Sequence, residues 1–210
     1  MNTLLICLSG PLQSWGESAR FNLRPTQQTP TKSGVLGLVC AAMGIARSDT
    51  ATLSKLNQLR FGVRVDCPGQ LLIDFHTVQK VVNVEGKIPQ DTTPTERYYL
   101  AGAVFLAGLE GNDRALLETI HCALLKPRWL LSLGRKSCIP GERPWLQDGL
   151  KDDSLENALR RYKSLHKDAI STFLEVEDST GSLRMDNPLH FGQRQYSPRL
   201  VRTLPLEAES

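Results

Sequence analysis

The chain has 210 residues, of which 40% are hydrophobic, and its formal net charge of +3 is too small to identify a nucleic-acid partner. The length suffices for one large domain or two small ones, and no stretch approaches the roughly 18 to 20 unbroken apolar residues of a membrane-spanning helix. The first residues lack the basic start and the cleavage site of a signal peptide, so we expect a cytoplasmic protein with no membrane contact.

The first expected elements are a strand, a long loop and an apolar helix. Residues 3–8 form a nearly continuous apolar run that is typical of a central strand covered on both faces. A loop over residues 10–30 follows and carries Arg24. In the helix that begins at Lys32, a stripe of small side chains predicts a close approach to a sheet; it consists of Gly34, Gly37, Ala41 and Gly44.

The start of this helix is the most informative local feature. Thr31 is the expected N-cap, so that Lys32, Ser33 and Gly34 lie at the positive end of the helix dipole. Free backbone N–H groups, an ammonium and a hydroxyl would bind an anion there, and we expect a phosphate. The alternative is a helix that is only capped. An ATPase is not indicated, because the residue before Lys32 is not the glycine of a P-loop.

The middle of the chain predicts a short helix over residues 50–58, then strands over 59–65 and 71–78 joined by a turn at 67–69. Apolar content then falls between Gln79 and Arg97, which indicates a long excursion, interpreted as an extended hairpin. A buried strand over 98–109 returns, and a helix begins after Asn112 or Asp113.

This order of elements predicts an α+β fold. A ferredoxin-like βαββαβ sheet with its helices on one face fits residues 1–145. Residues 146–210 are expected to form a small, irregular, β-rich extension packed on the same body. Within it we expect a helix over 154–165, a strand over 171–176 and two further strands near Leu183 and Leu200.

A basic stretch between the expected helix and the extension has the composition of an RNA contact. It contains Lys126, Arg128, Arg135, Lys136 and Arg143, with almost no acid. A glycine before the Arg-Lys pair, at residue 134, lets the main chain approach a sugar-phosphate strand, and Trp129 offers a surface for base stacking. The alternative is a solvated turn beside a core tryptophan.

Catalytic and metal-binding candidates are sparse. The five cysteines are scattered without a Cys-x-x-Cys pair, which indicates buried thiols in a reducing compartment; they are Cys7, Cys40, Cys67, Cys122 and Cys138. The four histidines share no metal-ligand spacing, so no metal and no cofactor are expected. His76, with Lys80 and Tyr98, offers the chemistry for metal-independent RNA cleavage, and such an endoribonuclease is the alternative function.

Several motifs together resemble one family. They occupy residues 10–16, 24–26, 30–38, 133–138 and 196–199 and read GPLQSWG, RPT, PTKSGVLGL, LGRKSC and YSPR. In this order they resemble CasD-type subunits of type I-E CRISPR Cascade complexes, which are members of the RAMP superfamily. The resemblance implies a ferredoxin-like, RRM-related domain whose protruding thumb hairpin, here about residues 79–97, helps to cap the 5′ handle of the CRISPR RNA.

The resemblance also implies partners and a role without catalysis. Such subunits contact the CasC-type backbone subunit and the CasA-type large subunit, and meet target DNA only indirectly. A separate subunit cuts the precursor RNA in these systems. We therefore expect RNA contacts, and no catalytic residues, from a set comprising Arg24, Lys32, Ser33, Gly34, His76, Lys80, Arg97, Arg128, Gly134, Arg135, Lys136, Ser137 and Cys138.

Overall fold

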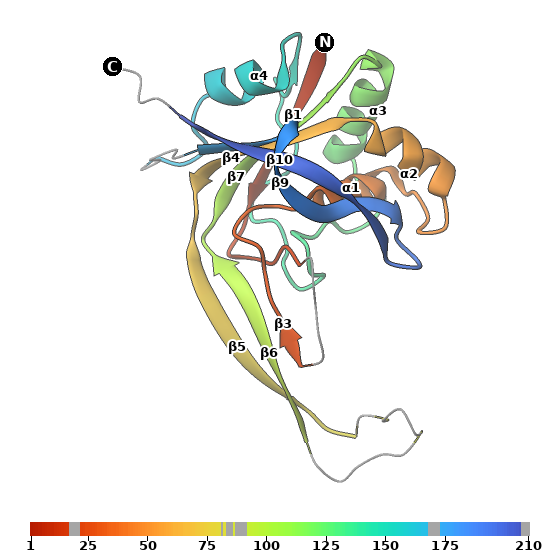
Figure 1. Cartoon of the computed structure of the whole chain (residues 1–210), viewed down its shortest axis with the longest axis vertical. Helices are drawn as coiled ribbons and strands as arrows, with labels where there is room; N and C mark the ends of the chain where they lie inside the picture. The colour runs from red at the N-terminus through yellow and green to blue at the C-terminus, as the bar shows by residue number, and fades with distance from the viewer. Residues whose placement is uncertain (17–21, 81, 83–85, 87–91, 168–172, 207–210) are drawn as a thin grey trace.

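The computed structural model describes residues 1–16, 22–80, 82, 86, 92–167 and 173–206 (Figure 1). Its helices are α1 (Lys32–Met43), α2 (Thr50–Asn57), α3 (Arg114–Leu125) and α4 (Leu155–Arg161). Its strands are β1 (Asn2–Ser9), β2 (Leu12–Gln13), β3 (Leu23–Arg24), β4 (Arg60–Cys67), β5 (Gln70–Val78), β6 (Thr93–Ala101), β7 (Val104–Gly111), β8 (Leu150–Lys151), β9 (Phe173–His190) and β10 (Gln195–Pro205). The predicted α+β class is confirmed.

The body is built on a six-stranded sheet with the order β10-β9-β4-β7-β1-β8. Strand β1 pairs antiparallel with β7 along its whole length, from Asn2 opposite Gly111 to Ser9 opposite Val104. Because side chains alternate along a strand, Leu4 of β1 packs on one face of the sheet and Leu5 on the other. The prediction that β1 is covered on both faces is therefore confirmed.

Helices cover both faces of this sheet; those within residues 1–145 share one face, as expected, and α4 of the C-terminal part covers the other. Buried side chains of α1, α2 and α3 share one core with Leu4, and those of α4 share a second core with Leu5. Two leucines of α4, Leu155 and Leu159, fill the space above Gly62 and Gly108 in the sheet. None of the described helices has the length and apolar character needed to cross a bilayer.

An arm protrudes from the body (Figure 1) and differs from the expected thumb in where it begins. Strands β5 and β6 pair antiparallel from Gln70 opposite Ala101 to Val78 opposite Thr93, in a second sheet with β2 and β3. Residues 71–78 are therefore part of the arm. The strand predicted over 98–109 is interrupted at Gly102, whose φ of 68° ends β6 before β7 enters the main sheet. Most of the tip predicted within 79–97 lies outside the described residues.

The C-terminal part is more regular than predicted. Strands β9 and β10 form a long antiparallel hairpin that contains the candidate strands near Leu183 and Leu200, and β9 joins the main sheet through β4. Their register shifts in three places, one of them between Ser197 and Arg199. Such irregularities bend a hairpin, and this one crosses over the start of α1.

Candidate nucleic-acid interface

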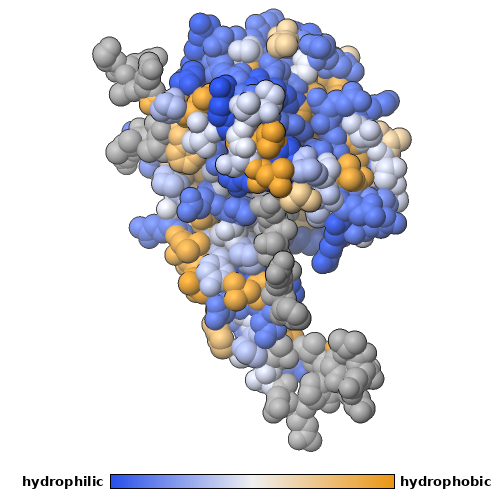
Figure 2. All heavy atoms as spheres, viewed as in Figure 1, coloured by the Kyte–Doolittle hydropathy of each residue, from blue (hydrophilic) through white to orange (hydrophobic). Residues whose placement is uncertain are grey.

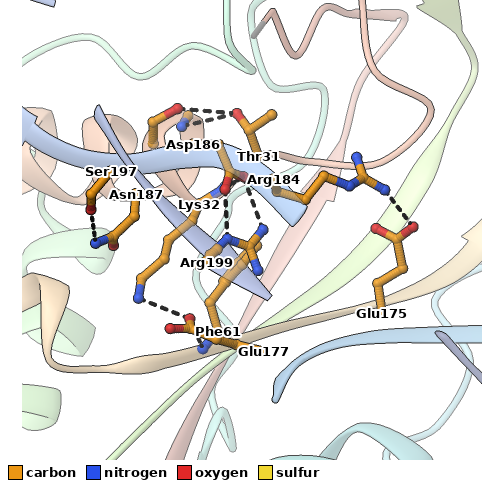
Figure 3. A network of polar contacts seen from close by, with 12 residues as sticks. Thr31, Lys32, Phe61, Glu175, Glu177, Arg184, Asp186, Asn187, Ser197 and Arg199 are labelled. Atoms are coloured by element: carbon orange, nitrogen blue, oxygen red, sulfur yellow. Dashed lines mark hydrogen bonds and ion pairs between the residues drawn. The ribbon is translucent and has the colours of Figure 1, made fainter. Parts of the chain in front are cut away.

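The start of α1 is already occupied by the protein's own charges (Figure 3). Thr31 is the N-cap, as predicted, and its hydroxyl accepts from the Gly34 N–H at 3.2 Å. The Lys32 N–H, however, donates to Oδ2 of Asp186 at 2.8 Å. A carboxylate from β9 thus takes the position that we expected a phosphate to fill.

The ammonium of Lys32 is also used within the fold. Its side chain is 1% exposed, and Nζ contacts Oε2 of Glu177 at 2.9 Å and the Asn57 carbonyl at 3.1 Å. Burial lowers the pKa of Lys32, and the neighbouring Glu177 opposes that shift. The burial of Lys32 and its pairing with Glu177 argue against the predicted phosphate contact.

Beside this closed helix start lies a groove of about 980 Å³, and five of the thirteen predicted site residues line it. Four cations line it: Arg47, Arg128, Lys136 and Arg194. Aromatic rings line it as well: Trp129, Phe191 and Tyr196. None of its lining residues, all of which belong to the described part of the chain, is acidic. Of the predicted residues, Ser33, Gly34, Arg128, Gly134 and Lys136 meet here.

One wall of the groove is the stripe of small residues on α1. Gly34, Gly37 and Ala41 line it, so the stripe faces the groove and Trp15 where we had expected a sheet. The segment after α3 runs along the end of the helix, where the Arg128 N–H donates to the Ala42 carbonyl at 2.9 Å. This segment satisfies helix-terminal carbonyls and places Arg128 and exposed Trp129 at the negative pole of the dipole.

The opposite wall is the tip of the β9–β10 hairpin, and sequence reasoning missed it. Phe191, Arg194 and Tyr196 line the groove from this tip, and a Cβ added at Gly37 would lie 3.9 Å from Cζ of Phe191. Arg194 has a φ of 54°, typical of a tight turn. The sequence around Arg194 does contain aromatic and basic residues close together, which is a composition suited to RNA contact. It does not indicate which part of the protein this turn approaches.

The basic turn at 134–138 joins the groove to the arm. Gly134 bridges to Ser14, and with a φ of 84° and the Ser14 carbonyl 1.8 Å from any added Cβ, only glycine fits there. Arg135 donates to the Arg24 carbonyl and stacks over the ring of Tyr99, with Cζ 5.0 Å from the ring centroid. Lys136 is exposed beside the groove.

The last two residues of this turn differ from each other. Ser137 is exposed but does not line the groove. Cys138 is 1% exposed and packs in the core, where burial raises its pKa, which argues against an RNA contact by its side chain. Cys7 and Cys40 are buried as expected, whereas Cys122 is exposed, and all five cysteines are free.

The two faces of the arm have different chemistry. Opposite pairs in an antiparallel ladder share a face, so Asp74 with Arg97 and His76 with Thr95 make one face of the arm mainly polar, and Leu72 with Tyr99 lies at its base. Arg24 of β3 pairs alongside Arg97, which adds a second arginine to that row. Lys80 lies beyond the end of β5 and is exposed.

The other face of the arm carries a row of exposed apolar side chains, and Glu96 lies among them opposite Phe75. Leu71, Ile73 and Phe75 are 61%, 56% and 65% exposed. Figure 2 shows orange patches along the arm between the body and its tip, with white and blue side chains among them. A contiguous apolar surface of this kind usually marks a protein–protein contact.

The candidate cleavage residues do not converge. His76 lies on the polar face of the arm, where it pairs with Asp74, and Tyr98 lies on the apolar face opposite Ile73. The Tyr98 hydroxyl donates to Glu96 at 3.2 Å, and this bond raises the pKa of Tyr98. Within the described residues, no three His, Cys, Asp or Glu side chains are grouped to hold a metal ion.

Comparisons with known proteins agree over almost the whole chain. A family model described as CRISPR-associated protein (Cas_Cas5) matches residues 3–202. The CRISPR system Cascade subunit CasD of Escherichia coli (strain K12) is 31% identical over 211 residues, which cover 93% of this chain and 92% of that protein.

Two solved structures are similar in fold. A crystal structure of a Cas protein superposes with a TM-score of 0.80 at 43% identity, covering 97% of this chain and 94% of that one. A chain of a CRISPR RNA-guided surveillance complex superposes with a TM-score of 0.77 at 32% identity, covering 97% and 90%. These similarities span the residues that form the groove.

Proposed function

We propose that this chain, which belongs to the Cas5 family of CRISPR-associated proteins, is a Cascade subunit that caps the 5′ handle of the guide RNA without cleaving it. Its place of action is the cytoplasm, which agrees with its five free cysteines. Membership of this family supports the assignment to a Cascade complex, and the chemistry of the groove supports the proposed contact with RNA.

The observation that carries this proposal is a groove with four cations and no acid among its lining residues. Phosphates require cations for register, and unpaired bases require flat apolar surfaces for stacking. The groove offers both, with Arg128 and Lys136 beside Trp129 and Tyr196. A single-stranded handle matches this arrangement, since its bases are free to leave the stack.

The two-faced arm supports a place between RNA and protein. Its polar face, with Arg97 and Arg24, continues from the Arg135 turn and is proposed to follow the RNA backbone. Its apolar face, with Ile73 and Phe75, is proposed to pack on the neighbouring CasC-type subunit, with the CasA-type subunit nearby. A hairpin with little support of its own gains stability from such cover.

The body is proposed to be a ferredoxin-like unit extended at one edge. The adjacent strands β8-β1-β7-β4 have the order and antiparallel pairing of a βαββαβ sheet, with α1 and α3 between strands. Residues 1–145 would supply all of it except β8. Residues 146–210 would add β8, α4 and the long hairpin to the same body.

The groove is tested by salt-dependent RNA binding. The variant replaces Arg47, Arg128, Lys136 and Arg194 by Gln. Each lost phosphate contact lowers the slope of log K against log salt by about 0.7, so four contacts account for about a 50-fold loss of affinity between 50 and 200 mM salt. A control with the same charge change replaces exposed cations outside the groove, namely Lys55, Arg114, Arg160 and Arg161.

The expected result is a weak, salt-insensitive complex for the groove variant and near wild-type binding for the control. Equal slopes in the two variants would refute the groove as the RNA site. Incubation with labelled repeat RNA in EDTA should give a shift without products. Defined products that disappear in His76→Ala would instead indicate the endoribonuclease.

The arm is tested by separating its two faces. Ile73→Thr with Phe75→Thr should leave RNA binding of the single chain unchanged and reduce assembly with the other Cascade subunits. Arg97→Gln should weaken RNA binding and leave assembly without RNA unchanged. The reverse pattern would mean that the faces are assigned the wrong way round.

A further inference from the structure

Asp186 is a buried carboxylate with an unusual set of partners (Figure 3). It is 2% exposed, and Oδ2 accepts from the Lys32 N–H at 2.8 Å. Its two oxygens also accept a forked pair of bonds from Arg199, at 2.6 and 2.9 Å. One carboxylate thus joins the first turn of α1 to both strands of the β9–β10 hairpin.

The hairpin is distorted where this contact forms. Ser197 pairs with Asn187, but the next matched pair is Arg199 with Arg184, so the register shifts beside Asp186. A shift of this kind re-aims side chains, and here it turns Asp186 inward to α1. The cation of Arg199 is itself only 8% exposed and lies over the ring of Phe61, so it depends on Asp186 for its charge partner.

The same hairpin carries one wall of the groove. Beyond Asp186 the strands continue through the pair Pro188 and Tyr196 to the tip that holds Phe191 and Arg194. Asn57, the last residue of the short helix α2, donates to the Pro188 carbonyl as a second tie to the body. Both ties fasten the hairpin to the body outside the groove, between the main sheet and the tip.

We propose that Asp186 is a positioning residue for RNA binding: by fastening the hairpin to α1 it holds Arg194 and Tyr196 at the correct distance from Arg128 and Lys136. The consequence for RNA rests on the proposed function of the groove. The fastening of the tip does not, because it is a property of the free protein. The two steps are tested separately.

The first test measures the tip without RNA. Asp186→Asn keeps the size of the side chain and removes the charge that Arg199 and the helix start require. Hydrogen exchange of the backbone amides of residues 189–196 should become about tenfold faster, while exchange in β1 and α3 stays as in the wild type. The matched control is Asp178→Asn, on the same strand, whose carboxylate pairs with Arg202 at 2.8 Å and does not contact α1.

The second test asks whether Asp186 acts through the tip. Asp186→Asn and the pair Arg194→Gln with Tyr196→Ala should each weaken binding of a handle RNA at least about tenfold. When the two changes are combined, Asp186→Asn should add less than about twofold, because the tip that it positions no longer contacts RNA. A carboxylate that only stabilised the whole fold would add its full effect in that background.

Each outcome has a separate meaning. Unchanged exchange at 189–196, or additive losses of affinity, would overturn the proposal. Failure of the wild-type protein to bind RNA would overturn the proposed function, while the exchange measurement would still decide whether Asp186 fastens the tip. If Asp186→Asn does not fold, Arg199→Lys keeps the charge but loses the forked contact and should show the same pattern in weaker form.

Discussion

Replacing Lys32 by Met separates the two roles that its position allows. The sequence places Lys32 at a helix start suited to a phosphate, whereas the structure pairs its buried ammonium with Glu177. Methionine fills a similar volume without charge. We expect the variant to lose stability and to keep its affinity for RNA.

The size of the loss follows from the burial of the two partners. Breaking a fully buried ion pair costs about 3–5 kcal/mol, because one charge is left without compensation. Lys32 is 1% exposed but Glu177 is 25% exposed, so the remaining carboxylate reaches some water, and we expect about 2–3 kcal/mol. For a chain of this size, this lowers Tm by about 5–10 °C.

A second substitution checks the assignment. Removing both charges, in Lys32→Met with Glu177→Gln, should restore the free energy of unfolding to within about 1 kcal/mol of the wild type, because no unpaired ion remains. Urea unfolding measures the free energies, and RNA titrations at 50 and 200 mM salt measure the slope. A stable Lys32→Met variant whose slope falls by about 0.7 would mean that Lys32 binds a phosphate after all.

Three further predictions concern the turn at Gly134, the stability of the fold at low pH and the reactivity of the cysteines. Gly134→Ala should cost at least about 3 kcal/mol, because its Cβ would meet a carbonyl oxygen, whereas Gly102→Ala, at a similar φ but in open space, should cost about 1 kcal/mol in urea unfolding. The hydrogen bond from Arg60 lowers the pKa of Glu156 in the folded protein. The ionised Glu156 therefore stabilises the fold fully above about pH 4.5, and this contribution is lost as the pH falls through the lower pKa of the folded state. Glu156→Gln should make Tm decline less steeply between pH 5 and 3 than in the wild type. Burial raises the pKa of Cys40 to about 12, so iodoacetamide at pH 8 should modify exposed Cys122 and not Cys40 in native protein, as read by peptide mass spectrometry.

Features that depend on residues close together in the sequence could be predicted, whereas features that depend on distant residues could not. Thr31 as an N-cap, the helix over residues 50–58 and the central strand β1 depend on neighbours within a few positions, and they were predicted correctly. Asp186 is far from Lys32 in sequence, and no local pattern indicates that its carboxylate reaches the helix start. The missed groove residues Arg194 and Tyr196 lie on the same distant hairpin.

The arm shows a different limit of sequence reasoning. Residues 98–109 read as one apolar strand because composition does not reveal that Gly102 adopts a positive φ. Because of this turn, residues 98–109 are divided between β6 of the second sheet and β7 of the main sheet, and β5 and β6 form the protruding arm. The apolar side chains of β5 then have no core to pack in, although their composition implied one, and they remain exposed.

Both ends of α1 organise the interface through opposite charges. Its N-terminal N–H groups attract an anion, as the sequence indicated, but the anion is Asp186 of the hairpin that carries the far wall of the groove. Its C-terminal carbonyls accept from the backbone of the segment at Arg128, so a cation gathers at the negative pole and forms the near wall. The RNA contact that we propose for the groove therefore requires no phosphate at the start of α1, because the helix acts on both walls through protein groups that it binds.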